Sequence, residues 1–106
     1  MARAETSDAV FEALSDPTRR DLLALVGRLE GATPTELASD LPVTRQAVSK
    51  HLSVLSCAGL VESSRAGREV RYRLTPAPLA EAMAWMAGVG AQWDARLARL
   101  QRQLSR

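Results

Sequence analysis

Residues 43–61 constrain the fold more than any other segment, because they predict an amphipathic helix that runs directly into a strand. Thr44 is a good N-cap, and Gly59 has the form of a left-handed helix stop. The face that belongs to a core consists of Val48, Leu52 and Leu55. The opposite face carries donors and acceptors that match base edges and phosphates, namely Arg45, Gln46, Ser49, Lys50 and Ser53. This face is expected to meet a nucleic-acid duplex, although a merely solvated face has a similar composition.

A shorter helix is predicted just before this one. Thr33 and Glu36 have the spacing of a capping box, with Pro34 at the first helical position. Its small apolar face consists of Leu37, Ala38 and Leu41. Pro42 ends the helix and leaves a tight connection over residues 40–44. Two short helices joined by such a turn form a helix-turn-helix.

A β-hairpin is predicted directly after the second helix. Residues 61–65 and 69–74 alternate in polarity, and Gly67 lies in the turn between them. In the second strand Val70, Tyr72 and Leu74 are expected to point inward, and Glu69, Arg71 and Arg73 outward. A basic hairpin in this place is typical of a wing that reaches phosphates or a minor groove. Charges also protect edge strands from pairing, but the arginines favour phosphate contact, with Arg65, Arg68 and Arg71 as candidates.

These segments predict a mainly α fold with a small β component (α+β). We expect one winged helix-turn-helix domain over residues 1–106, with about five helices, a two-stranded wing and a long C-terminal helix. Residues 9–74 form its core part. A chain of 106 residues supports only a modest core, and such a domain often gains stability by oligomerising.

The charge distribution supports a duplex-binding surface more strongly than the total charge does. The net charge is only +2. Residues 1–43 carry four basic and eight acidic residues, whereas residues 44–73 carry six basic and two acidic ones. Positive charge is thus concentrated on the predicted recognition helix and wing. The modest total predicts limited non-specific affinity for nucleic acid.

The C-terminal segment has apolar residues at alternating spacings of four and three, the pattern of a heptad seam along one helix. The members of the seam are Leu79, Met83, Met86, Gly90, Trp93, Leu97, Leu100 and Leu104. Thr75 is expected to cap this helix, and Gly88 and Gly90 to favour a bend. The seam exceeds what the small body needs, so a second copy is expected to cover it. Residues 1–14 and 76–104 are therefore assigned to dimerisation, with Val10 and Leu14 joining the seam residues from Leu79 to Leu100.

Catalysis and membrane insertion find no support in the composition. One histidine, His51, and scattered serines provide neither a nucleophile with a positioned base nor a carboxylate pair in a pocket. The single cysteine, Cys57, excludes an internal disulfide framework and suits a small core or boundary residue, with a redox role as the alternative. No segment resembles a signal peptide or a membrane span, so a cytoplasmic protein is expected.

Several motifs together resemble the ArsR-type bacterial winged-helix repressors. They lie in order at residues 14–20 (LSDPTRR), 36–38 (ELA), 46–52 (QAVSKHL), 58–61 (AGLV) and 67–74 (GREVRYRL). The resemblance implies a homodimer, built from the first and last helices, that binds an inverted-repeat operator in double-stranded DNA and blocks transcription. By position, it implies that Gln46, Ser49 and Lys50 face the groove, with Thr44 and Arg45 at the helix start and Arg68 on the wing.

The chain departs from the metal-sensing members of that family. Those sensors carry cysteines in the short helix before the turn, where residues 36–41 contain none, or histidines in the final helix, which also contains none here. One cysteine and one histidine cannot supply a tetrahedral site within a protomer. A member that senses no metal and needs no cofactor is therefore expected.

Two questions stay open at this point. A winged helix can also serve protein contact without DNA readout, but such a module should show an exposed apolar patch in place of the polar groove-facing residues. The regulatory signal is the second question. The protein is either constitutive or autoregulatory, or it responds to a small molecule between the long helices. Such a pocket would involve Met83, Trp85, Met86 and Trp93, which at helical spacing also suit a plain dimer core.

Overall fold

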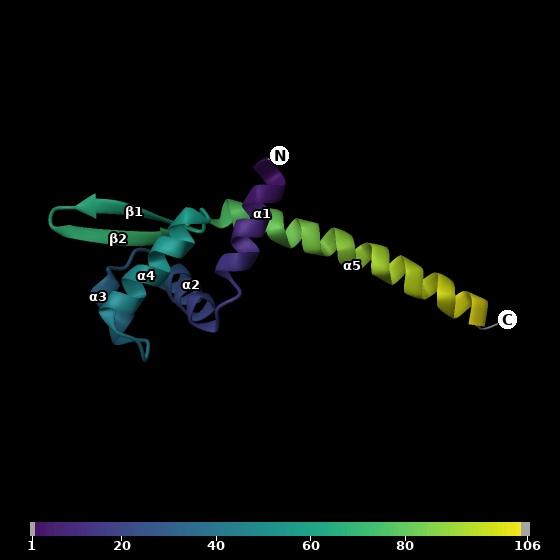
Figure 1. The fold of residues 1–106 in the computed structure, drawn as a ribbon, viewed down its shortest axis with the longest axis horizontal. Coiled ribbons are helices and arrows are strands. Elements are labelled where there is room, and N and C mark those ends of the chain that lie inside the picture. The colour runs from purple at the N-terminus through teal and green to yellow at the C-terminus, as the bar shows by residue number, and fades with distance from the viewer. Residues whose placement is uncertain (1, 105–106) are drawn as a thin grey trace.

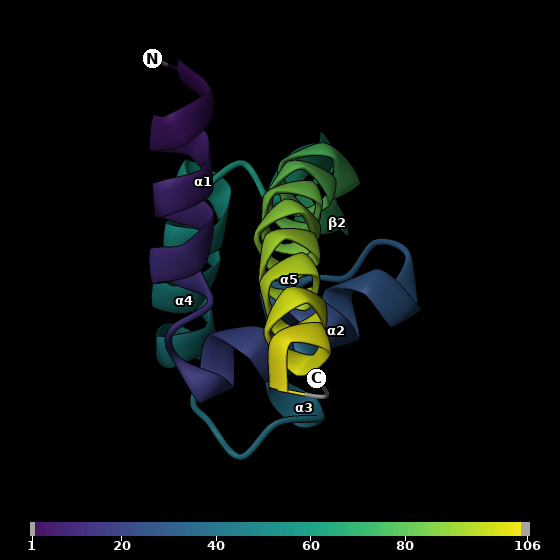
Figure 2. The ribbon, with the colours of Figure 1, turned by 90° about the vertical axis from the view of Figure 1, so that its right-hand side faces the viewer.

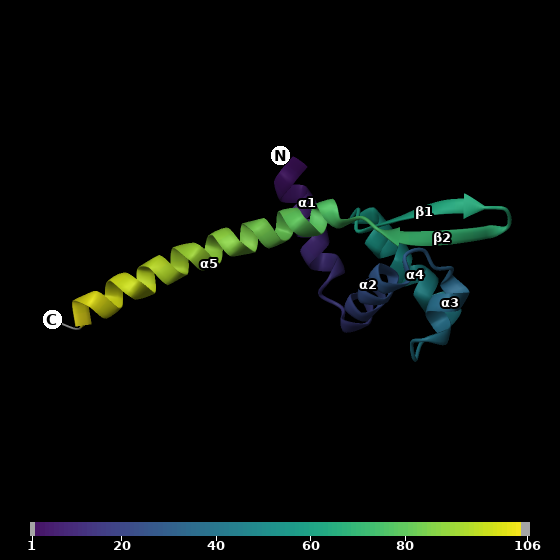
Figure 3. The same ribbon diagram turned by 180° about the vertical axis from the view of Figure 1, so that it is seen from behind.

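The computed structural model describes residues 2–104, with side chains from Asp8 onward; Met1 and residues 105–106 of the expected domain lie outside it. Within this range the chain forms five helices and one antiparallel two-stranded sheet, as expected (Figure 1). The elements are α1 (Ala2–Ala13), α2 (Pro17–Leu29), α3 (Pro34–Ser39), α4 (Arg45–Cys57), β1 (Val61–Ala66), β2 (Glu69–Leu74) and α5 (Pro76–Leu104). The hairpin projects from one end of the molecule and α5 from the other (Figures 1 and 3), which gives overall dimensions of 69 × 32 × 20 Å.

The core lies where α1 to α4 meet the base of the hairpin. Its largest fully buried side chains are Val10, Leu22, Val26, Leu37, Val48, Leu52, Leu55 and Leu60. Full burial of each such side chain contributes about 1.5–3 kcal/mol before the entropy of ordering is subtracted. The predicted inner faces of α3 and α4 are therefore confirmed, and α4 can turn only its other face to solvent.

The predicted helix-turn-helix is confirmed together with its caps. The Glu36 amide donates to Thr33 Oγ1 over 3.2 Å, and Glu36 Oε1 accepts from the Thr33 amide over 3.5 Å, which completes the capping box. Thr44 caps α4 by accepting from the Ala47 amide over 3.1 Å. Gly59 ends α4 with φ +76°, a left-handed conformation that only glycine adopts without strain.

The wing is a hairpin with a two-residue turn. Its register pairs Val61 with Leu74 at the base and Ala66 with Glu69 at the tip. Ala66 was expected to lie in the loop, but it is the last residue of the strand. Gly67 supplies the positive φ of +65° that a tight hairpin turn needs. Ala32, in the linker between α2 and α3, also forms a bridge with Tyr72 through bonds of 3.1 and 2.9 Å. The hairpin is thus hydrogen-bonded to the entrance of the helix-turn-helix.

The C-terminal end of α1 is held by two arginines of α2, a role that the sequence did not reveal. Arg19 Nε donates to the Ala13 carbonyl over 2.6 Å, and Arg20 Nη1 donates to the Leu14 carbonyl over 2.7 Å. The last carbonyls of a helix lack intrahelical partners, and cationic side chains can satisfy them. Residues 16–20 therefore both begin α2 and fix the direction of α1.

The assignment of Val10 to a dimer interface is wrong. Val10 is fully buried within one protomer, because α1 packs against both α5 and α4 and this side chain joins the core. Leu14 and Leu79 are half-buried and also pack against this core. Phe11 of α1 meets Trp85 of α5 edge-on at 5.7 Å between ring centroids. Figure 2, which views α5 nearly end-on, shows α1 beside it.

Helix α5 is continuous from Pro76 to Leu104 and passes through both Gly88 and Gly90. The expected cap by Thr75 is wrong, since Thr75 Oγ1 is buried without a hydrogen-bond partner in the part of the chain described. The reason lies in the sequence of the first turn. A capping side chain accepts from the amide of the second or third helical position, and Pro78 at the third position has no amide hydrogen, so only the Ala77 amide remains.

Asp16 caps α2 and yields a pH-dependent prediction. Its carboxylate accepts from the amides of Thr18 and Arg19 over 2.7 and 3.2 Å. The Arg19 amide lowers the pKa of Asp16, and the Thr18 amide and the Arg19 guanidinium add to this, against a partial desolvation that raises it. A lowered folded pKa means that the stabilisation by Asp16 is present above about pH 4 and is lost as the pH falls through the folded value.

We therefore expect Asp16→Ala to destabilise the protein at neutral pH, and its deficit in free energy of unfolding to shrink as the pH falls below about 4, the ordinary pKa of an aspartate. Urea denaturation at each pH measures this deficit. Asp16→Ser retains a neutral cap, so its advantage over Asp16→Ala should not vary over the same range. A deficit of Asp16→Ala that is equally large in acid would contradict the assignment.

A second prediction concerns Glu30, the one described non-glycine residue with positive φ. It ends α2 at φ 52° and ψ 45°, a conformation that costs an L-residue about 1 kcal/mol or more. Glu30→Gly should therefore raise the free energy of unfolding by about 0.5–1 kcal/mol. Glu30→Ala removes the same carboxylate but keeps the strain, so it should not stabilise. Thermal unfolding at one fixed protein concentration compares the two, and equal melting temperatures would refute the strain.

Candidate nucleic-acid interface

The outer face of α4 carries the side chains that the sequence assigned to base contact. Arg45, Gln46, Ser49 and Lys50 are all exposed along the first half of the helix. Ser53 is exposed too, but its hydroxyl donates to the Ser49 carbonyl over 3.1 Å and is thus held within α4. The burial of Val48, Leu52 and Leu55 on the other side fixes the rotation of α4. The four free side chains therefore share one rigid, solvent-facing strip.

Two arginines extend this positive surface onto the wing. Arg65 lies on β1, next to Ala66 of the last residue pair of the hairpin, and Arg68 lies in the turn. Both are exposed, and within residues 8–104 neither side chain makes a hydrogen bond or ion pair. The wing and the helix-turn-helix lie at the end of the molecule opposite to the free end of α5 (Figure 1). Unpaired cations in this position are free to contact phosphates.

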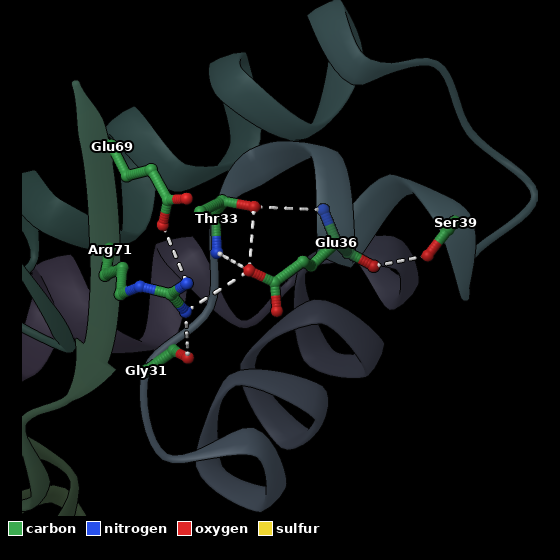
Figure 4. Close-up of polar contacts among 6 residues, drawn as sticks. All are labelled: Gly31, Thr33, Glu36, Ser39, Glu69 and Arg71. Atoms are coloured by element: carbon green, nitrogen blue, oxygen red, sulfur yellow. Dashed lines mark hydrogen bonds and ion pairs between the residues drawn. The ribbon is translucent and has the colours of Figure 1, made fainter.

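Arg71 behaves differently from the other basic residues of the wing. Its guanidinium lies 3.2 Å from Glu36 Oε1 and 2.7 Å from Glu69 Oε2, and it donates to the Gly31 carbonyl over 3.2 Å (Figure 4). Arg71 lies on the same side of β2 as Glu69 and Arg73, but these three acceptors beside the strand hold its side chain on the protein, so it does not extend freely outward as expected. Sequence analysis assigned Glu36 to the capping box alone and so missed this link.

The apolar seam of α5 is exposed in the single chain. Met83, Met86, Trp93, Leu97 and Leu100 are each 48–57% exposed, and Leu104 is 77% exposed. The seam continues the stripe that begins with half-buried Leu79 and buried Ala82 at the base of α5. Arg96 lies over the ring of Trp93 at 5.4 Å from its centroid. A patch of this extent on a small protein indicates a surface that contacts another molecule.

Cys57 is exposed, contrary to the expected core or boundary position. It lies in the last turn of α4, on the side opposite to Leu55, beside a shallow groove between α1 and α4. The groove is lined by Ala9, Glu12, Ala13, Arg19, Ser53, Val54, Cys57 and Ala58. The four residues that a small-molecule pocket was expected to involve, including Trp85 and Trp93, are not part of it.

Two absences among the described residues concern metal binding and membrane crossing. Residues 2–104 contain no cluster of three or more histidine, cysteine, aspartate or glutamate side chains that could hold a metal ion. In the same part of the chain no helix is both long and apolar enough to cross a membrane. His51 is half-buried on α4.

Comparisons with known proteins agree with this geometry. Residues 14–64 match a family model described as a helix-turn-helix domain. The chain is 45% identical over 82 residues to the HTH-type transcriptional regulator Rv2034 of Mycobacterium tuberculosis, a match that covers 76% of this chain and 74% of that protein. It is 34% identical over 79 residues to the transcriptional repressor SdpR of Bacillus subtilis, covering 73% of this chain and 84% of SdpR.

A solved structure supports the same family. An ArsR-like transcriptional regulator from Rhodococcus sp. RHA1 superposes with a TM-score of 0.82 at 42% identity, over 96% of this chain and 95% of that one. Among the curated relatives the matched part spans between 54% and 84% of the relative's own length. The superposition on this structure includes the two helices, the turn and the wing, whereas the family model ends at residue 64, within β1.

Proposed function

Because the chain belongs to the ArsR-type winged helix-turn-helix transcriptional regulators, we propose that it represses transcription by binding an inverted-repeat operator as a homodimer. The observation that carries the proposal is the strip on α4 that presents Arg45, Gln46, Ser49 and Lys50 together at the surface. The repressor function of SdpR, one of the relatives, favours repression over activation. As a regulator of bacterial genes it would act in the cytoplasm, on its own promoter among others.

In this proposal the groove-facing residues divide by chemistry. Gln46 can pair with an adenine through both its amide oxygen and its nitrogen, and Arg45 and Lys50 can donate to guanine or to phosphates. Thr44 and Ser49 contribute hydroxyls, and Thr44 can still donate while its oxygen accepts from Ala47. Ser53, whose hydroxyl donates to the Ser49 carbonyl, can still accept. Arg65 and Arg68 add phosphate contacts from the wing, which position the domain without reading sequence.

The dimer supplies the second half-site. Each protomer would read one half of the inverted repeat, so affinity for the whole operator requires two copies held at one spacing. The seam from Met83 to Leu100 is the proposed contact, because its exposed apolar side chains need a cover that one chain does not provide. Gly90 leaves open space beside it, which would allow a partner helix to approach closely.

The proposal includes no metal, cofactor or catalytic step. Residues 36–41 carry no thiolate, and α5 carries no histidine, so the sites typical of metal-sensing relatives lack their ligands in this sequence. We infer that induction, if it occurs, uses a different signal.

DNA readout is tested by two alanine variants that should fail in different ways. Gln46→Ala should lose about 1–3 kcal/mol on operator DNA and little on random DNA, since it removes a base contact. Arg68→Ala should weaken binding to both and reduce the slope of log affinity against log salt by about one, since it removes a phosphate contact. Fluorescence anisotropy over a salt series measures both constants, on fragments of the source genome that the wild-type protein retains.

Identical losses for the two variants on both DNAs would refute this division of roles. A wild-type protein that retains no duplex, but captures a protein partner, would instead favour a protein-contact module.

The dimer is tested by placing a charge in the seam. Leu97→Arg puts an uncompensated guanidinium where the partner helix would lie, and its desolvation should cost several kcal/mol, so the dimer should dissociate. Operator binding should then fall although residues 44–73 are untouched. Ala95→Arg adds the same charge to the opposite side of α5 and should leave both properties intact. Sedimentation equilibrium and an operator titration decide, and a folded, dimeric Leu97→Arg protein at micromolar concentration would rule out the seam.

A further inference from the structure

Arg71 links three segments of the chain that are distant in sequence. Its guanidinium contacts Glu69 on β2 itself, the Gly31 carbonyl in the linker before α3, and Glu36 in the first turn of α3 (Figure 4). The fork of an arginine can reach several acceptors in fixed directions, which the point charge of a lysine cannot. Both carboxylates that it meets are exposed at their edges, and Arg71 itself is about one-third exposed.

The same place carries the only backbone bridge between the wing and the helix-turn-helix within residues 2–104. Ala32 and Tyr72 exchange two hydrogen bonds directly beside Arg71 in sequence. Glu36 Oε1, which Arg71 approaches, also accepts from the Thr33 hydroxyl over 3.1 Å and from the Thr33 amide. The ion pair is thus continuous with the capping box that starts α3.

The charge of Arg71 is already balanced by the protein. Two carboxylates lie within 3.2 Å of its guanidinium, whereas Arg65 and Arg68 have no such partner among the described residues. Bringing a phosphate to Arg71 would require it to leave Glu36 and Glu69, or would place two negative groups beside the phosphate. A direct phosphate contact is therefore the less favourable use of this side chain.

We propose that Arg71 is a positioning residue, which fixes the angle of the wing relative to α3 and α4, and that phosphate contacts at the tip of the wing come from Arg65 and Arg68 and not from Arg71. This inference rests on the DNA binding proposed above. Because the ion pair is partly exposed and screened by water, it contributes little to global stability. It acts on orientation: with Glu36 and Gly31 held, the wing and the helix-turn-helix meet the duplex as one rigid body.

The decisive experiment compares Arg71→Met with Arg68→Met on DNA. The probe is a labelled duplex of about 30 base pairs, enough for two half-sites, selected by the wild-type protein from a random pool. Arg71→Met should weaken binding roughly three- to tenfold with no change in the salt slope. Arg68→Met should reduce that slope by about one. A slope that falls by one for Arg71→Met overturns the proposal.

Glu36→Gln provides the partner variant, since glutamine still completes a capping box. If the Arg71–Glu36 ion pair positions the wing, Glu36→Gln should also weaken DNA binding, and the double variant with both substitutions should bind no more weakly than Arg71→Met alone. A direct phosphate contact predicts the opposite sign, because removing Glu36 would free the cation and tighten binding. Arg73→Met is the matched control, as Arg73 lies on the same side of β2 without an ion pair in the described residues.

A readout without DNA separates this inference from the proposed function. Hydrogen exchange of the Ala32 and Tyr72 amides should accelerate in Arg71→Met and Glu36→Gln and stay at the wild-type rate in Arg68→Met. Unchanged exchange in the first two variants overturns the positioning role. If the wild-type protein binds no duplex at any salt concentration, the proposed function fails, and the exchange rates alone still decide whether Arg71 holds the wing to α3.

Discussion

The burial of one face of α4 is the constraint on which the rest of the molecule depends. Val48, Leu52 and Leu55 are inaccessible to solvent, and so is Leu60 directly after the helix. The Leu60 amide donates back to the Leu55 carbonyl over 3.0 Å, so the chain leaves α4 in one direction and enters β1 from there. Rotating α4 would expose these side chains and lose several kcal/mol of apolar burial. The polar strip and the origin of the wing are therefore set by the same packing.

Local chemistry made much of this fold predictable. Thr33, Glu36 and Thr44 act through hydrogen bonds to residues three positions away, and Gly59 and Gly67 through backbone conformation, so the sequence alone contains the whole interaction. The helical spacing of Val48, Leu52 and Leu55 predicted the inner face of α4. These features define the helix-turn-helix and wing without any knowledge of the tertiary structure.

Contacts between distant segments account for the errors. Val10 is equally apolar whether its own protomer or a partner covers it, and only the packing of α1 against α4 and α5 decides between the two. The alternation of side chains along β2 places Arg71 on its outward side, but the linker at Gly31 lies alongside that strand and supplies a carbonyl acceptor. Cys57 is exposed in the last turn of α4. At the end of a helix few residues remain to define the apolar period, so the period predicts burial poorly there. Thr75 is the exception, because Pro78, which removes one of the two amides that a cap can use, was visible in the sequence.

Helix α5 would couple folding to assembly if the proposed dimer forms. Its base, at Leu79 and Ala82, belongs to the core of the single chain, and the same stripe continues as exposed apolar surface for the rest of its 29 residues. If a second copy covers that surface, the partner acts as a ligand of the native state, and stability grows with the logarithm of protein concentration. Dilution would then loosen the protein without any change in temperature or solvent, and the cell would tune its melting point through the number of copies it makes.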